Sequence, residues 1–177
     1  GGTGKNGGDG IYSIDDLTIE GGKIEQATGG NSTDATGGDG IHGDNKLTIS
    51  GGTIVEAVGG NTGDGIGSGS GNRSNSTTVT INGGRVEKAH GGKGYSIFDG
   101  GDGIHSGSVV KISGDTITKA TGGNATGENS TGGSGIGGSL TQHLPAGLHL
   151  PAQLADGLQQ LCAVGAAVHI FEDGIVA

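Results

Sequence analysis

Apolar and polar residues follow one recurring pattern along residues 1–139. Each copy holds a three-residue run in which two apolar side chains flank a polar one, as in Leu47-Thr48-Ile49. A Gly-Gly pair follows in three copies, and Gly114-Asp115 replaces it in the fourth; another apolar residue, a small alanine and a second Gly-Gly pair come next in every copy. Alternation with a period of two is typical of a half-buried β-strand. The pattern therefore predicts short strands with glycines at the bends between them.

The copies recur at a nearly constant spacing. The apolar residue that ends the strand run returns after 30, 32 and 31 residues, at Ile19, Ile49, Ile81 and Ile112. One copy cannot bury its apolar side alone, whereas coils stacked about 4.8 Å apart bury it continuously. We therefore predict an all-β fold, a right-handed parallel β-helix (β-solenoid) of four to five coils.

Residues 140–177 differ from the repeats in composition. They contain no Lys or Arg, and both prolines of the chain lie there. Apolar residues at helical spacing, among them Leu154, Leu158 and Leu161, predict a short amphipathic helix over 151–164. We expect two units, a glycine-rich solenoid of residues 1–139 and a second unit of residues 140–177. The second unit caps the open end of the stack, forms a homo-oligomer contact, or is junction or non-native sequence.

Composition and charge exclude several classes of protein. Of the 177 residues 45 are glycine, which rules out a helical bundle for most of the chain. The formal net charge is −9 and no basic patch occurs, so we expect no nucleic-acid partner. No apolar stretch reaches the length of a membrane span. The single cysteine, Cys162, has no partner for an internal disulfide.

The motifs GGDGI (residues 37–41) and LTISGGTIVEAVGGN (residues 47–61) resemble the glycine-rich repeats of bacterial surface and secreted proteins. The resemblance covers residues 1–139 and implies a right-handed parallel β-helix. Some proteins with such repeats are described as carbohydrate-binding or adhesive. The resemblance thus implies an extracellular or cell-surface location, or a virion if the chain belongs to a phage.

We therefore expect a non-catalytic extracellular recognition or adhesion module that binds a glycan or polysaccharide. Two alternatives stay open: the tip of a phage or prophage tail fibre that binds a host-surface molecule, and a polysaccharide lyase or hydrolase. The chain has only two arginines, Arg73 and Arg85, and the spacing of its Ser, His, Asp and Cys residues matches no nucleophilic catalytic set. For this reason we expect no enzyme.

Repeated polar positions are the candidate ligand-binding residues, because a regular polymer matches a regular surface. They are Thr18, Thr48, Thr80 and Lys111 on one line, Asn31, Asn61, Lys93 and Asn124 on another, and Arg73 in the longest insertion. The threonine line also suggests an ice-binding face, which Lys111 interrupts. The asparagines have a structural alternative, since stacked Asn side chains can hydrogen-bond along the coils.

One acidic position repeats inside the GGDGI motif, at Asp9, Asp39, Asp64 and Asp102. In stacked coils these carboxylates would lie about 5 to 7 Å apart, where like charges repel unless something compensates. Two interpretations follow: the column binds Ca²⁺, the only cofactor we consider, or each Asp accepts hydrogen bonds from N–H groups of its own turn. The motif resembles the calcium-binding nonapeptide of RTX proteins, but it lacks the second acidic residue. For His42 and His105, which follow the motif, we expect structural or surface roles.

Overall fold

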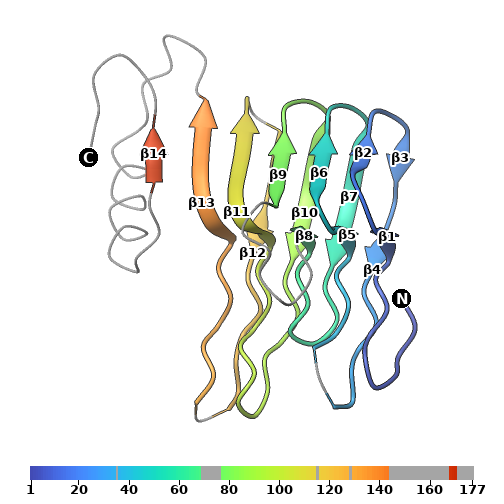
Figure 1. Cartoon of the computed structure of the whole chain (residues 1–177), viewed down its shortest axis with the longest axis vertical. Coiled ribbons are helices and arrows are strands. Elements are labelled where there is room, and N and C mark those ends of the chain that lie inside the picture. The colour runs from blue at the N-terminus through green and yellow to red at the C-terminus, as the bar shows by residue number, and fades with distance from the viewer. Residues whose placement is uncertain (35, 69–76, 115, 128, 144–167, 171–177) are drawn as a thin grey trace.

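The computed structural model describes residues 1–34, 36–68, 77–114, 116–127, 129–143 and 168–170 (Figure 1). This part of the chain is all-β, and its parallel strands stack as a β-solenoid of about four turns. The predicted β-solenoid is thereby confirmed. The helix predicted over 151–164 lies outside the described residues.

Each coil contributes strands to two parallel sheets. The first row of the nine-stranded sheet holds β1 (Ile11–Ser13), β5 (Ile41–Gly43), β8 (Ile66–Ser68) and the start of β11 (Ile104–Ser113). Its second row holds β2 (Leu17–Ile19), β6 (Lys46–Ile49), β9 (Thr78–Ile81) and the end of β11. The five-stranded sheet holds β3 (Lys23–Ile24), β4 (Ala27–Thr28), β7 (Thr53–Val58), β10 (Arg85–His90) and β12 (Ala120–Thr121).

Equivalent residues of successive coils stack directly on one another. Ile49 pairs with Ile19 below it and with Ile81 above it, and Ile81 pairs with Ile112. Both Ile49 and Ile81 are fully buried. The apolar columns that the alternation predicts are therefore the core of the strand half of the solenoid.

The C-terminal side of the stack continues beyond the boundary predicted between residues 139 and 140. Strand β13 (Ile136–His143) pairs with β11 along its length, with Leu140 opposite Val110 and Thr141 opposite Lys111. Strand β14 (Val168–Ile170) pairs in turn with β13. The repeat thus extends to His143. The cap, oligomer and junction hypotheses refer to residues 140–177, of which 144–167 and 171–177 lie outside the described residues.

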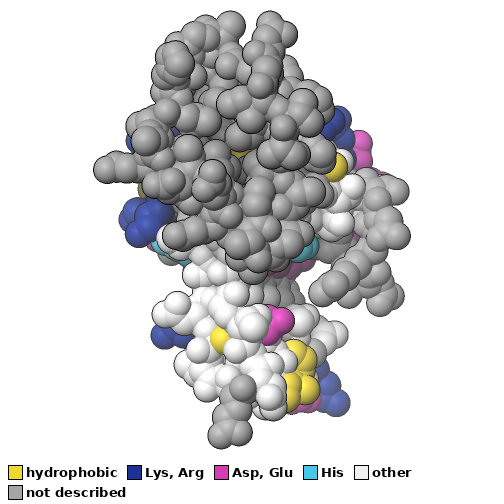
Figure 2. Space-filling view, turned by 90° about the vertical axis from the view of Figure 1, so that its left-hand side faces the viewer, with side chains coloured by type: hydrophobic (Ala, Val, Ile, Leu, Met, Phe, Trp, Pro, Cys, Tyr) yellow, Lys and Arg dark blue, Asp and Glu magenta, His cyan; other side chains and the backbone are white. Residues whose placement is uncertain are grey.

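The other half of each coil is built from glycine main chain. Two backbone segments face each other and alternate in one series of hydrogen bonds: Gly38 N–H donates to Gly30 O over 2.9 Å, and Gly60 N–H donates to Gly38 O over 2.8 Å. The series continues through Gly63, Gly92, Gly101, Gly123 and Gly133. Figure 2 shows this half as the narrower lower part, in which white, the colour of backbone and of side chains that are neither hydrophobic nor charged, predominates. Main-chain hydrogen bonds hold it together where an apolar core is absent, and only glycine permits so close an approach.

Glycines also form the corners that the sequence predicts. The second glycine of the corner pair has a positive φ in the first three coils: 78° at Gly22, 78° at Gly52 and 67° at Gly84. A side chain is strained in this left-handed conformation, so glycine is the fitting residue there.

Candidate functional site

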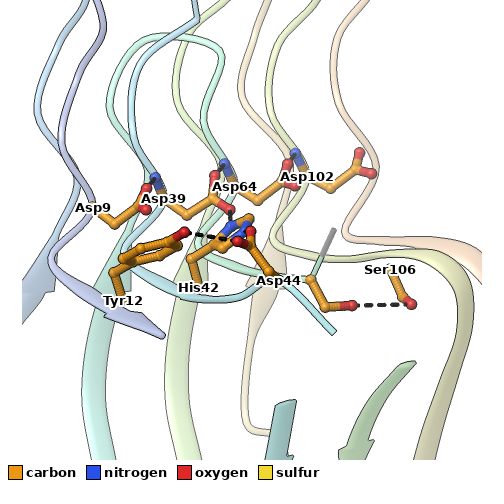
Figure 3. A network of polar contacts seen from close by, with 9 residues as sticks. Asp9, Tyr12, Asp39, His42, Asp44, Asp64, Asp102 and Ser106 are labelled. Atoms are coloured by element: carbon orange, nitrogen blue, oxygen red, sulfur yellow. Dashed lines mark hydrogen bonds and ion pairs between the residues drawn. The ribbon is translucent and has the colours of Figure 1, made fainter. Parts of the chain in front are cut away.

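The aspartates of the GGDGI motif lie where the glycine half of the coil meets the strands. Figure 3 shows Asp9, Asp39, Asp64 and Asp102 in one row, one from each coil. Each carboxylate Oδ1 accepts a hydrogen bond from the main-chain N–H of the equivalent residue in the next coil, at 2.6, 2.7 and 2.7 Å. The row ends at Ser134, whose N–H donates to Asp102 over 2.6 Å. The aspartates therefore link successive coils, and the N–H groups they accept from are not those of their own turn.

A second column, three residues after each aspartate, lies beside the first. In the second coil it holds His42, whose Nδ1 lies 2.5 Å from Asp39 Oδ2 and whose Nε2 lies 3.0 Å from Asp44 Oδ1. The first coil has Tyr12 here, and its hydroxyl donates to Asp44 Oδ2 over 2.7 Å. His42 is only 8% exposed. Buried between two carboxylates, its imidazole is fixed in orientation.

The third coil is different, because it has Gly67 in the position of His42. Only two residues, Thr62 and Gly63, separate Asn61 from Asp64, whereas the other coils carry longer loops there. Asp64 consequently has no imidazole partner from its own coil. In the fourth coil the aspartate again has an imidazole partner, since His105 Nδ1 lies 2.7 Å from Asp102 Oδ2.

Two hollows in the surface lie beside this short loop. One hollow, of about 460 Å³, extends from Asp64 toward Asp9 and Tyr12, and a second, of about 380 Å³, extends toward Phe98 and Ser134. Both hollows are lined by Thr36, Thr62, Asp64 and His105. The two hollows therefore adjoin at these residues, Asp64 among them, and we refer to them together as the groove.

Aromatic side chains stand at both ends of the groove. Tyr12, 53% exposed, lines one end, and Phe98 lines the other. The ring of Tyr95 lies 5.4 Å from that of Phe98, in a turn closed by main-chain hydrogen bonds of 3.1 and 2.9 Å between the two residues. The whole chain has only two Tyr, two Phe and no Trp. Three of these four aromatic residues thus gather around one groove.

No known protein family, curated protein or solved structure matches this chain. No helix in the described ranges is long and apolar enough to cross a membrane. A functional assignment therefore depends on the geometry and charge of the groove.

The groove is acidic, and its carboxyl and imidazole groups shift each other's pKa. Burial, followed by the charge of Asp39, raises the pKa of Asp64 above its usual range. For His42, burial opposes the charged form, but the hydrogen bond and charge of Asp39 outweigh it and raise the pKa to about 9. The hydrogen bond to Asp102 likewise raises the pKa of His105. No lysine or arginine is found among the described residues that line either hollow.

We expect the thermal midpoint of the protein to fall as the pH rises from about 6 to about 10. The folded-state pKa of His42, about 9, exceeds its ordinary value of 6.5, so its stabilisation is complete below 6.5 and is lost through pH 9. Asp64 acts in the same direction, because its raised pKa means that ionisation costs more in the folded chain than in the unfolded one. Midpoints at several pH values test this.

Asp64→Asn should flatten this pH dependence. The asparagine oxygen still accepts the Asp102 N–H, which Asp64 Oδ1 accepts over 2.7 Å, but it carries no buried charge. The variant should therefore melt higher than the parent at pH 10. Asp15→Asn, at an exposed position, is the matched control. An equal fall in all three proteins would contradict this account of Asp64.

The other residues expected to bind a ligand lie elsewhere. The threonine line stacks in register as predicted, Thr18 on Thr48, Thr48 on Thr80 and Thr80 on Lys111. In the second line, Asn31 Oδ1 accepts a hydrogen bond from the main-chain N–H of Asn61 over 2.9 Å, so this link between coils runs from side chain to main chain and does not join two Asn side chains. Lys93 and Asn124 are exposed in the same line. None of these eight residues lines the groove, and Arg73 lies outside the described residues.

Sequence reasoning found the aspartates but missed Tyr12, Asp44 and Phe98. A signal for Tyr12 was present, because Tyr12, His42, Gly67 and His105 occupy one repeat position. Comparing the residue type at that position from coil to coil points to the third coil, where the column has no ring.

Proposed function

We propose that this chain is a non-catalytic recognition or adhesion module that binds a glycan in the groove across its third coil. The proposal rests on the arrangement of carboxyl hydrogen-bond acceptors and aromatic rings in the groove. Asp64 and its neighbouring carboxylates lie in the groove, and Tyr12 and Phe98 lie at its two ends. Sugar hydroxyls donate hydrogen bonds to carboxyl oxygens, and the apolar face of a sugar ring packs against an aromatic side chain.

The charge of the groove narrows the class of glycan. Asp9, Asp39, Asp64 and Asp102 outnumber the two histidines, and no basic side chain lies among the described lining residues. An acidic polysaccharide would be repelled, whereas a neutral or amine-bearing glycan would not. Such ligands occur on cell surfaces and in extracellular matrices, in agreement with an extracellular, cell-surface or virion location.

A glycan array probed with the full chain tests this proposal, followed by calorimetry on the glycans that bind. Tyr12→Ala and Phe98→Ala should each weaken binding about tenfold, because each removes one ring at an end of the groove. Ile97→Ala is the matched control, since Ile97 is 69% exposed and adjacent to Phe98 but does not line the groove.

Two results would contradict the groove as the binding site. The first is unchanged affinity in both aromatic variants. The second is loss of binding in Thr48→Ala, which would place the ligand on the threonine line. A reducing-end assay on the same glycans separates the binding module from a polysaccharide lyase or hydrolase, because either enzyme releases new reducing ends when it cleaves the chain.

A further inference from the structure

Two aspartates and one histidine meet at the end of the groove beside Tyr12. Asp9 precedes β1 in the first coil, Asp39 precedes β5 in the second coil, and His42 lies within β5 (Figure 3). One carboxylate oxygen from each aspartate and one ring nitrogen of His42 all lie within 4.8 Å of one another. This is the only such group in the part of the chain that the structure describes.

The surroundings of His42 orient its ring toward this point. Its Nε2 lies 3.0 Å from Asp44 Oδ1, and Tyr12 holds the other oxygen of Asp44 over 2.7 Å. When Nε2–H donates to Asp44, the lone pair of Nδ1 points at Asp39 Oδ2, 2.5 Å away. Without metal, a proton lies between these two atoms and forms the ion pair, and a metal ion that binds Nδ1 takes the place of this proton, which leaves to solvent. A carboxylate on the far nitrogen is also the arrangement that typically orients metal-bound histidines.

We propose that Asp9, Asp39 and His42 bind a divalent transition-metal ion of the class of Zn²⁺ and Co²⁺. Imidazole nitrogen favours such ions over Ca²⁺, and three protein ligands leave a coordination position open toward the groove. Metal–ligand distances of about 2.0 to 2.2 Å place tetrahedral ligand atoms roughly 3.4 Å apart. The Asp39 carboxylate therefore turns away from His42 by about 1 Å when the ion enters.

The local charge favours the ion as well. Asp44 adds a third carboxylate beside His42, and the described lining of this hollow contains no lysine or arginine. A divalent cation compensates this excess of negative charge. The metal site stands independently of glycan binding, because its ligands all belong to the protein.

This site differs from the calcium column expected from the sequence. Asp64 and Asp102 are not part of the group, and the Oδ1 atoms of the column already accept main-chain N–H groups. The fourth coil repeats the Asp–His pair with Asp102 and His105, but Gly107 stands where the second coil has Asp44. His105 thus lacks the carboxylate that orients His42, which makes it a control within the same chain.

The test is a titration of the full, untagged, chelator-treated chain with Zn²⁺ and Co²⁺, followed by calorimetry and by the visible absorption of Co²⁺. We expect saturable binding of one ion and a ligand-field spectrum. His42→Gln should abolish both, and Asp44→Asn should weaken binding about 10- to 100-fold because His42 loses its orienting partner. His105→Gln should leave affinity and spectrum unchanged. Thermal melting of each variant without metal reports whether it folds.

Asp9→Asn covers the case in which His42→Gln does not fold. Asparagine still accepts the Asp39 N–H, which Asp9 Oδ1 accepts over 2.6 Å, but it is a poor metal ligand. The variant should fold and bind Zn²⁺ at least tenfold more weakly. The proposal is overturned if neither ion binds saturably, if a folded His42→Gln or Asp9→Asn binds as the parent does, or if Ca²⁺ binds more tightly than Zn²⁺.

Discussion

Gly92→Ala should lower the free energy of unfolding by about 3 kcal/mol or more, enough to leave most of the protein unfolded if its stability is ordinary. A Cβ atom on Gly92 would lie 2.5 Å from the carbonyl carbon of Gly60 and would overlap its oxygen. Gly60 cannot move aside freely, because its own main chain belongs to the hydrogen-bonded series. Gly92 donates to Gly63 O over 2.8 Å and accepts from Gly101 N–H over 2.9 Å, so any shift also strains these bonds.

Gly21→Ala is the matched control for this substitution. A Cβ atom there meets nothing within 4 Å, so its effect should be small. Urea unfolding of the parent and both variants, followed by circular dichroism, measures the difference. Similar stabilities for Gly92→Ala and Gly21→Ala would show that the two glycine segments do not pack as closely as described.

The strand half of the fold could be predicted because its signals are local and repeated. Alternation around Thr48 assigns Leu47 and Ile49 to the inside, and both are fully buried. The corner at Gly52 could be predicted for the same reason, since a glycine pair between two strands requires a bend. Because the pattern repeats, a wrong assignment of inward and outward residues in one copy would conflict with the assignments in the other copies.

The glycine half could not be predicted in the same way. A Gly-Gly pair has the same sequence whether it forms a bend, as at Gly52, or faces another main chain, as at Gly60 and Gly92. The difference is the distance between two backbone segments, which no residue pattern encodes. Composition was also misleading, because a low content of large apolar residues normally argues against a fold. Here main-chain hydrogen bonds replace apolar burial in half of every coil.

The candidate site was predictable in part. The aspartate column is visible as a repeat, but the contact of Tyr12 with Asp44 joins residues of different coils and depends on their register. The hollows flank the short loop before Asp64, and the third coil also lacks the ring that the other coils carry at the position of Gly67. A missing ring or a shorter loop can be interpreted only when the positions of the neighbouring coils are known.

Ile81→Ala should destabilise the protein by about 2 to 5 kcal/mol, and Ile49→Ala by a similar amount. Ile81 is fully buried and stacks between Ile49 and Ile112 in the second row of the larger sheet. Removing its side chain loses apolar burial and leaves a cavity. That cavity cannot collapse, because the ladder hydrogen bonds on both sides fix the spacing of the coils at about 4.8 Å. Urea unfolding at one pH measures the loss.

Ile14→Ala provides the matched control for this prediction. It removes the same atoms from a side chain that is 71% exposed, so its stability should stay within about 0.5 kcal/mol of the parent. The contrast between the two isoleucines tests the register itself, because a slip of one residue would turn every apolar column outward. If Ile81→Ala is no more destabilising than Ile14→Ala, the alternation does not define the core, and the stacking of Ile19, Ile49, Ile81 and Ile112 is wrong.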